Sequence, residues 1–502
     1  MIENSLPLLD STGHAYYSMT KSLCAVCKQG VDAKIIVRDG KVYFDKYCPE
    51  HGHQECMVAS SAQWYFDCLS FLSVTTPPTR VTKPVELGCP FDCGACASHQ
   101  QKVYLPVVPI TSACNLDCPI CYTINKNKSA YEMTAEEMQM ILRHLLEDHD
   151  DLDIINFTGG EPTLHPGLVE FMEMCREAGI RRLTVSTNGL KLMDRDYLEK
   201  LARLDVRVVL SFDTFSPETD MQLLGANTVN RKLKLLDLLA EHDVTTTLLP
   251  AIAAGYNDSE VGDILNLVLS RPNICSLELH TMTFTGQGGK GFSRSGRITI
   301  PDLHRRIEES TDGAIQADDF VPSPLAHPHC YSICYLLLLG DGKYIPFTRI
   351  MPREQLYELL QDSLYIEPRD HLESVFREAI DRLWTEPDLI PESRLVLKTL
   401  KSMLRTLYPD NQAALPLDSR RKLAERFTKA IYIHSHMDEE SFDVSRIMKC
   451  CVGVPDATGG NIPTCSYNVL YREKDPRFAS ADMLERMARI RTEDDNAPIT
   501  DR

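Results

Sequence analysis

The placement of cysteine is the feature that most constrains how this chain can fold. The sequence has 18 cysteines in 502 residues, and eleven of them precede residue 122. The N-terminus lacks the basic, apolar and small-residue segments of a signal peptide, so we expect a cytoplasmic protein. Clustered cysteines in that compartment bind metal or do redox chemistry more often than they form disulfides. We therefore expect metal-bound modules.

Composition narrows the choice of partners. Apolar residues make up 43% of the chain and charged residues 25%, as in ordinary globular proteins. The net charge of -18 argues against a nucleic-acid partner, because a phosphate backbone needs a basic surface. No run of 18 apolar residues is present, so we expect no transmembrane span. A small-molecule or lipid substrate is expected instead, and contact with a membrane surface stays open.

Three regions follow one another along the chain. Residues 1–104 are expected to form a small β-rich module that is held together by bound metal. Asp39-Gly40 within it is typical of a hairpin turn. Residues 105–300 alternate apolar, strand-like runs with helical stretches. Residues 301–502 are mainly helical, carry further cysteines and end in a charged tail after Arg477. The strand-like runs are 105–110, 154–157, 183–186, 206–212, 246–251 and 276–281.

The alternation of these runs with helices predicts the fold class. Repeated strand-helix units of this length form parallel βαβ structure, and six in a row favour a partial (βα)6 barrel over a flat doubly wound sheet. We therefore expect an α/β barrel with functional groups at the carboxyl ends of its strands. The helical stretches are 134–146, 167–178, 194–204, 227–242 and 259–270, followed in the last region by 370–383, 392–407 and 419–432.

Cys114, Cys118 and Cys121 close a short loop directly after the first strand-like run. Three thiolates at this spacing can ligate three irons of a [4Fe-4S] cluster and leave the fourth iron open. A structural zinc loop is the alternative, but zinc favours paired C-x2-C knuckles with four ligands. An open iron is a place where a cofactor or substrate can bind.

Polar residues and glycines end the next three strand-like runs. The first run ends in Gly159-Gly160-Glu161-Pro162, where glycine allows close backbone approach and a carboxylate can meet an ammonium group. Ser186-Thr187-Asn188 ends the second run, and Ser211 and Asp213 end the third. At the shared edge of a parallel sheet, these groups are expected to lie close together.

The cysteine triad and the Gly-Gly-Glu-Pro element together resemble the signature of the radical S-adenosylmethionine (SAM) superfamily. The resemblance implies that the open iron chelates the amino acid part of SAM and that Gly160 and Glu161 receive its methionine end. It also implies contacts from the polar strand ends to the ribose and carboxylate of SAM. The implied chemistry is reductive cleavage of SAM to a 5′-deoxyadenosyl radical, with electrons from a donor such as ferredoxin or flavodoxin.

A further metal site is predicted in the first region. Cys24 and Cys27 form a knuckle, and Cys48 supplies a third thiolate for a structural zinc or a rubredoxin-like iron. The fourth ligand is open among His51, His53 and Cys56.

Cys89, Cys93 and Cys96 repeat the spacing of the Cys114 triad, which predicts an auxiliary [4Fe-4S] cluster. Five late cysteines either complete this cluster or form another one, and sequence alone does not group them. They are Cys330, Cys334, Cys450, Cys451 and Cys465. The isolated Cys68, Cys175 and Cys275 are expected to be buried apolar side chains.

The order of the cysteine motifs, with the segments 442–450 and 462–468, resembles one branch of the superfamily over residues 21–475. That branch holds the archaeal tetraether lipid synthase and pterin methylase-like proteins, and it implies one or two auxiliary clusters and a rubredoxin-like iron. We expect carbon-carbon bond formation at unactivated C-H positions, by joining lipid chains or alkylating a small molecule. The alternatives are C-methylation of a pterin-like ring with a methylene-folate donor, and an iron-sulfur electron-transfer protein without substrate chemistry. A lipid would need a long apolar groove in residues 300–440, whereas a methylase would need a polar ring pocket.

Weaker signals lie near residue 290. Residues 286–291 are glycine-rich but lack the ending of a phosphate-binding loop, so we expect a flexible loop over the barrel mouth. Arg294 and Arg297 are either anion contacts or solvated charges. Glu278 and His280 share one face of a strand, where they are either substrate contacts or satisfied core residues.

Overall fold

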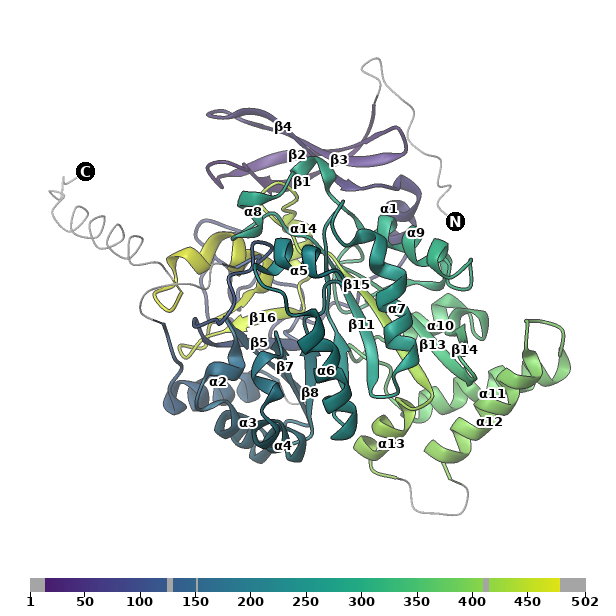
Figure 1. Ribbon diagram of the computed structural model, residues 1–502. Helices are drawn as coiled ribbons and strands as arrows, with labels where there is room; N and C mark the ends of the chain where they lie inside the picture. The colour runs from purple at the N-terminus through teal and green to yellow at the C-terminus, as the bar shows by residue number, and fades with distance from the viewer. Residues whose placement is uncertain (1–13, 124–129, 150–151, 410–414, 479–502) are drawn as a thin grey trace, which may run out of the picture.

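The computed structural model describes residues 14–123, 130–149, 152–409 and 415–478, so most of the charged tail lies outside the described residues. Its centre is a large curved sheet with six neighbouring parallel strands in chain order (Figure 1). Each strand coincides with one of the expected apolar runs, which confirms the partial barrel. The strands are β5 (Leu105–Thr111), β6 (Ile154–Gly159), β7 (Arg182–Thr187), β8 (Val206–Leu210), β9 (Thr246–Leu248) and β11 (Ile274–Thr281).

Five helices alternate with these strands, as the helical stretches predict, and pack their apolar faces on the sheet to form the main core. The helix after β5 begins at a capping box of Thr134 and Glu137, which satisfies free backbone N–H groups. The helices are α2 (Ala135–Asp148), α3 (Leu168–Glu177), α4 (Arg195–Arg203), α6 (Val229–Glu241) and α7 (Val261–Ser270).

The sheet continues into the C-terminal region at both edges. At one edge β15 (Thr428–His434) pairs parallel with β11, and β13 (Tyr331–Gly340) pairs antiparallel with β15. At the other edge β16 (Val452–Pro455) pairs parallel with β5. Short strands extend the sheet further: β10 (Ala251–Ile252), β12 (Val321–Pro322), β14 (Lys343–Pro346) and β17 (Asn461–Pro463).

The helix expected over 419–432 is wrong in its second half. Helix α13 (Leu417–Ala424) is followed by β15 and not by further helical turns. Ile431 and Ile433 face the barrel core, whereas Ala430 and Tyr432 face the core of the helical region. A strand buried on both faces is apolar throughout, so its sequence lacks the alternation that marks an ordinary strand.

The first region forms a four-stranded antiparallel sheet at the top of the molecule in Figure 1. Asp39 and Gly40 both have positive φ, 51° and 71°, which confirms the expected hairpin turn. The buried Lys46 Nζ donates to the carbonyl oxygens of Leu23 and Glu440, at 2.7 and 2.6 Å, and so joins this sheet to the C-terminal segment. The strands are β1 (Ala15–Leu23), β2 (Gly30–Arg38), β3 (Lys41–Cys48) and β4 (Gly52–Ala59), followed by α1 (Ala62–Leu69).

The C-terminal helices pack into a core of their own. Helices α11 (Asp370–Thr385) and α12 (Ser393–Leu407) bury apolar side chains against one face of β13 and β15. Among the described residues, no helix is long and apolar enough to cross a membrane. The remaining helices are α5 (Pro217–Leu224), α8 (Gly288–Gly291), α9 (Ile300–Ser310), α10 (Arg353–Glu358), α14 (Val444–Met448) and α15 (Thr464–Ser466).

Candidate active site

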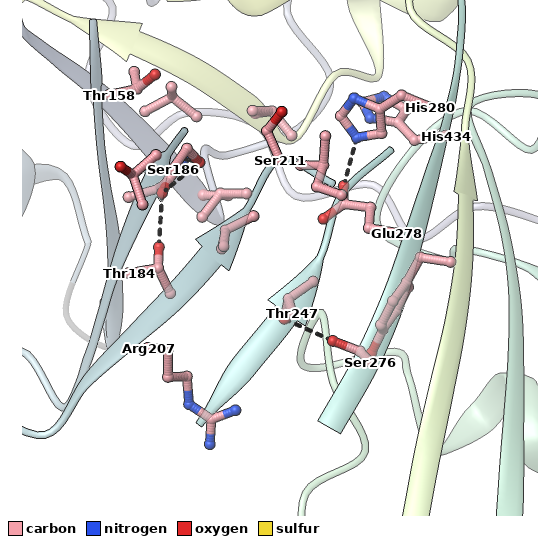
Figure 2. Close-up of a pocket in the computed structure, with 18 of the residues that line it drawn as sticks. Thr158, Thr184, Ser186, Arg207, Ser211, Thr247, Ser276, Glu278, His280 and His434 are labelled. Atoms are coloured by element: carbon pink, nitrogen blue, oxygen red, sulfur yellow. Dashed lines mark hydrogen bonds and ion pairs between the residues drawn. The ribbon is translucent and has the colours of Figure 1, made fainter. Parts of the chain in front are cut away.

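A cavity of about 420 Å³ runs through the inside of the barrel. At the carboxyl ends of the strands it is lined by Cys114, Cys118 and Cys121, and at the opposite ends by Arg182 and Arg207. Figure 2 shows side chains of several barrel strands turned into this space. The cavity therefore connects the predicted cluster loop with the interior of the barrel.

The loop that carries the cysteine triad is fixed by backbone and side-chain hydrogen bonds. The amide of Cys121 donates to the carbonyl of Cys118 at 3.1 Å, and Gln287 Nε2 donates to the same carbonyl at 2.9 Å. The amide of Gly288 donates to the carbonyl of Cys121 at 2.8 Å. Four of the glycine-rich residues form the short helix α8, next to the cysteine loop, so this part of the segment is helical and not a loop. Its flexibility stays a prediction.

Gly159 and Gly160 lie where β6 meets the end of β5 and the loop that follows. A Cβ at Gly159 would lie 2.2 Å from the carbonyl oxygen of Thr111, and a Cβ at Gly160 would lie 2.2 Å from that of Ala113. Gly159 also has a φ of 147°, which L side chains rarely adopt. Both positions need glycine, and the closeness of the two backbones sets the wall of the cavity next to the three thiols. The three thiols and the two glycines therefore fit the [4Fe-4S] cluster and the SAM cofactor that the resemblance implies.

Glu161 is buried, and its carboxylate already accepts several hydrogen bonds. Oε1 accepts from Thr187 Oγ1 at 2.6 Å and from Thr163, and Oε2 accepts from the amide of Asn188 at 2.8 Å. Burial raises the pKa of this carboxyl group above its usual value. The carboxylate therefore ties the end of β6 to the end of β7, and its contact with an ammonium group stays a prediction.

The other predicted strand-end residues converge on the same cavity. Ser186, Thr187, Asn188, Ser211 and Asp213 all line it, as do Gly159 and Gly160. Asp213 accepts from the amide of Ala251 at 2.8 Å and from Ser211 Oγ at 3.0 Å. Burial raises the pKa of Asp213, although the ammonium of Lys232 lies 4.0 Å away. Pro162 begins the turn over residues 162–164 that follows the two glycines.

Glu278 and His280 both line the cavity, and His280 Nε2 lies 2.9 Å from Glu278 Oε1. Sequence reasoning missed their neighbours His434 and His436 and the cavity-lining tyrosines 331, 335, 365 and 432. All of these come from residues 331–436, whose strands join the barrel from far along the chain. The only available signal was the alternation His434-Ser-His436 after an apolar run.

The first-region cysteines gather into one site. Cys24, Cys27, Cys48 and His51 bring their ligand atoms within 4.8 Å of one another. Of the three open candidates for a fourth ligand, only His51 joins this group in the described residues. His53 instead pairs with Asp45, and the thiol of Cys56 donates to the backbone of Met57.

The auxiliary cysteines divide into neighbouring groups. Cys89, Cys93 and Cys96 surround a small recess against α14. Cys330, Cys450 and Cys451 pack in a second cluster. Burial, together with the nearby thiols of Cys465, Cys451 and Cys330, raises the pKa of Cys450 well above its ordinary value. Cys334 lies apart in the barrel core, beside Leu336 and Ile431. Which of these cysteines bind iron stays a prediction.

Three smaller expectations can be compared with the structure. Cys68 and Cys175 are buried, but Cys275 lines the cavity, so its interpretation as a buried apolar side chain is wrong. Cys275 lies at the start of β11, where the register with β9 shifts between Ile274 and Ser276 and interrupts the alternation of Ser276, Glu278 and His280 into the cavity. Arg297 pairs with Asp438 at 2.7 Å, and Arg294 pairs with Glu440 at 3.0 Å. Both arginines are therefore ion-paired, and neither is a solvated charge.

Known proteins resemble this chain over both of its first two regions. Residues 108–268 match the radical SAM superfamily, and residues 16–60 match the HMPTM N-terminal zinc ribbon domain. The 7,8-dihydro-6-hydroxymethylpterin dimethyltransferase of Methanocaldococcus jannaschii is 30% identical over 95% of this chain and 98% of its own length. The GTP 3′,8-cyclase of Alkaliphilus oremlandii is 30% identical over 54% of this chain and 93% of its own.

Among solved structures, SuiB of Streptococcus suis bound to S-adenosylmethionine has a TM-score of 0.35 and 20% identity, covering 42% of this chain and 48% of that one. The match to the dimethyltransferase extends over nearly the full length of both proteins, from the zinc ribbon through the barrel to the C-terminal region. The chain is a radical SAM enzyme, and it belongs to the family that contains the M. jannaschii dimethyltransferase.

Proposed function

We propose that this radical SAM enzyme C-methylates a small polar ring of the pterin type, with a methylene-folate compound as the one-carbon donor. The support comes from the full-length relative, whose name gives a hydroxymethylpterin as its substrate. It also comes from the chemistry of the cavity, which is the observation that carries the proposal. The lipid-coupling interpretation receives no such support from these relatives.

The walls of the cavity suit a flat, polar ring. Asn156 bonds Thr184 and Ser186 across two strands, at 2.9 and 3.1 Å, and Thr247 bonds Ser276 at 2.7 Å (Figure 2). These side chains present donors and acceptors inside the barrel. The C-terminal strands add tyrosines, whose faces can stack on a ring. Specific polar groups within an enclosed, partly aromatic cavity are typical of small-molecule sites.

A long acyl chain fits this architecture less well. The apolar side chains of α11 and α12 pack against β13 and β15 in a core of their own. None of the described residues of these two helices lines the cavity. The helical region therefore closes the barrel and does not extend it into a long apolar groove.

The residues around the thiols have definable tasks. When bound, a [4Fe-4S] cluster on Cys114, Cys118 and Cys121 would supply the reductive cleavage of SAM that yields a 5′-deoxyadenosyl radical. Glu161 holds the ends of β6 and β7 together, and Asp213 fixes the backbone at Ala251. The C-terminal strands β15 and β13 continue the sheet beyond β11 and line part of the cavity. We propose that the auxiliary cysteines hold further iron-sulfur clusters and that a ferredoxin or flavodoxin supplies the electrons.

The test is an anaerobic assay of the reconstituted full-length protein with 7,8-dihydro-6-hydroxymethylpterin, SAM and a strong reductant. Parallel reactions contain ¹³C-labelled methylenetetrahydrofolate or methyl-deuterated SAM. We expect 5′-deoxyadenosine and a pterin heavier by one or two methyl groups, with ¹³C in the product. A variant with Cys114→Ala, Cys118→Ala and Cys121→Ala serves as the control and should make neither product.

Deuterium in the product instead of ¹³C would overturn the assignment of the donor. If 5′-deoxyadenosine forms while the pterin keeps its mass with both donors, the assignment of the substrate is wrong, although the enzyme class stands.

A further inference from the structure

His280, His434 and His436 bring three imidazoles together on the wall of the cavity. His280 and His434 are register partners near the ends of the parallel strands β11 and β15, and His436 follows two residues later. The ring centroids lie 4.1 to 5.1 Å apart, and one ligand atom of each ring lies within 4.8 Å of the other two. We propose that these three histidines bind a divalent transition-metal ion of the zinc or ferrous-iron class, at a site other than the Cys24 site and the Cys114 triad. His436 Nδ1 also lies 3.6 Å from Cys465 Sγ, at the edge of this site.

The donor set suits such an ion. Neutral imidazole nitrogens are common ligands of zinc, iron and related metals, whereas hard cations prefer oxygen. Within the described residues, the ring of His434 makes no side-chain hydrogen bond and stacks on Tyr331 at 3.9 Å. Because His434 lines the cavity, a ring nitrogen of this side chain is available to ligate a metal ion there. His436 stacks on Tyr122, which also holds its ring in place.

Glu278 stands where a supporting carboxylate is found in metal sites. A ligating histidine usually donates its other ring N–H to a carboxylate or carbonyl, which fixes the ring and raises its basicity. The contact between His280 Nε2 and Glu278 Oε1, at 2.9 Å, has this form (Figure 2). The guanidinium of Arg446 donates to Cys330 Sγ and to the carbonyl of Ser435, between His434 and His436, and places a positive charge near these two rings.

Three protein ligands leave part of the coordination sphere open. Structural zinc sites are closed by four protein ligands, whereas sites that bind substrate keep a position for water or for the substrate itself. All three histidines line the same cavity as the cysteine triad. The open side of the ion would therefore take an oxygen or nitrogen donor of the molecule in the cavity, a step that rests on the proposed function, while metal binding itself does not.

Metal content measures the proposal without any activity assay. The full-length protein is reconstituted with iron and sulfide, incubated with Zn²⁺, freed of loose metal, and examined for zinc by mass spectrometry and zinc X-ray absorption. We expect wild type to hold about twice as much zinc as His434→Ala. The zinc left in the variant should have the sulfur-rich environment of the Cys24 site, and wild type should show added nitrogen ligands. The iron and sulfide contents of wild type and His434→Ala should be the same.

The matched control is His304→Gln, which changes another buried histidine that bonds Ser332 and does not line the cavity. It should keep the zinc content of wild type. If His434→Ala also loses iron, the more exposed His280→Gln decides, and Glu278→Gln should weaken zinc binding about 10- to 100-fold. Equal zinc in wild type, His434→Ala and His280→Gln would overturn the proposal, as would wild-type zinc bound by sulfur-rich ligands alone.

Discussion

At the scale of single residues, the two glycines next to the cysteine triad make the strictest demand on the sequence. We predict that Gly160→Ala lowers the rate of SAM cleavage on the order of a hundredfold, because a displacement of about 1 Å near reacting groups can cost that much. The added Cβ would lie 2.2 Å from the carbonyl oxygen of Ala113, so the backbone must move beside the cluster loop. The measurement is the rate of 5′-deoxyadenosine formation at equal iron content.

Gly291→Ala provides the matched control for this substitution. A Cβ at Gly291 would meet no atom within 4 Å, so the same chemical change costs nothing in packing. Its rate should equal that of wild type. Equal rates in the two alanine variants would show that the closeness of the two backbones is not needed for catalysis.

A second residue-scale prediction concerns the pH dependence of stability. Burial, with a smaller contribution from Arg353, lowers the pKa of His304 to about 3 from its ordinary 6.5. Below pH 6.5 the unfolded chain binds a proton at this side chain and the folded chain does not. The free energy of unfolding therefore decreases as the pH falls from 6.5 toward 3. Between pH 7.5 and pH 5.5 this residue should lower the free energy of unfolding by about 1.4 kcal/mol.

His304→Gln removes that titration while keeping a polar amide as a partner for Ser332 Oγ, which lies 2.8 Å from His304 Nε2. The urea midpoints of wild type and variant, compared at pH 7.5 and pH 5.5, should therefore move closer together or cross in favour of the variant at the lower pH. The other buried histidines titrate in both proteins and cancel in the difference. A constant difference in midpoint across this range would contradict the prediction.

At the scale of helices and strands, the local pattern of apolar residues predicts the six barrel strands. It does not predict the C-terminal strands that continue the sheet beyond β11. The ends of β5, β6 and β7 can be predicted from the sequence, because a loop of cysteine, glycine or polar residues follows each apolar run. Because the carboxyl ends of parallel strands share one edge of the sheet, the sequence also predicts that the thiols, the glycines and Asp213 lie at that edge. Strand β15 escaped prediction, since both of its faces are buried and its pairing with β11 joins residues about 150 positions apart. The histidines and tyrosines that complete the cavity were missed for the same reason.

At the scale of the whole molecule, a buried ion-pair network joins the barrel to the C-terminal region at the floor of the cavity. Glu367 accepts from Arg182 at 2.6 Å and from Arg421 at 2.7 Å, and Asp153 accepts from Arg421 at 2.8 Å. Burial alone would raise the pKa of Glu367, but the two guanidinium groups outweigh it and hold the pKa below its usual value. The stabilisation is therefore fully present above the ordinary carboxyl pKa and is lost as the pH falls below it and through the lowered pKa of the folded protein.

We predict that Glu367→Gln lowers the free energy of unfolding by about 3 to 5 kcal/mol near neutral pH. The substitution leaves the two buried guanidinium groups with only Asp153 and the more exposed Asp418 as carboxylate partners. The exposed Glu358→Gln serves as the control and should leave the melting temperature unchanged. The loss should first loosen the contact between the helical region and the barrel, since Arg182 and Arg421 line both this interface and the cavity. Hydrogen exchange should therefore rise at α13 and at the start of β7 before the N-terminal sheet responds. A melting temperature equal to that of the control variant would show that the C-terminal strands alone hold the barrel closed.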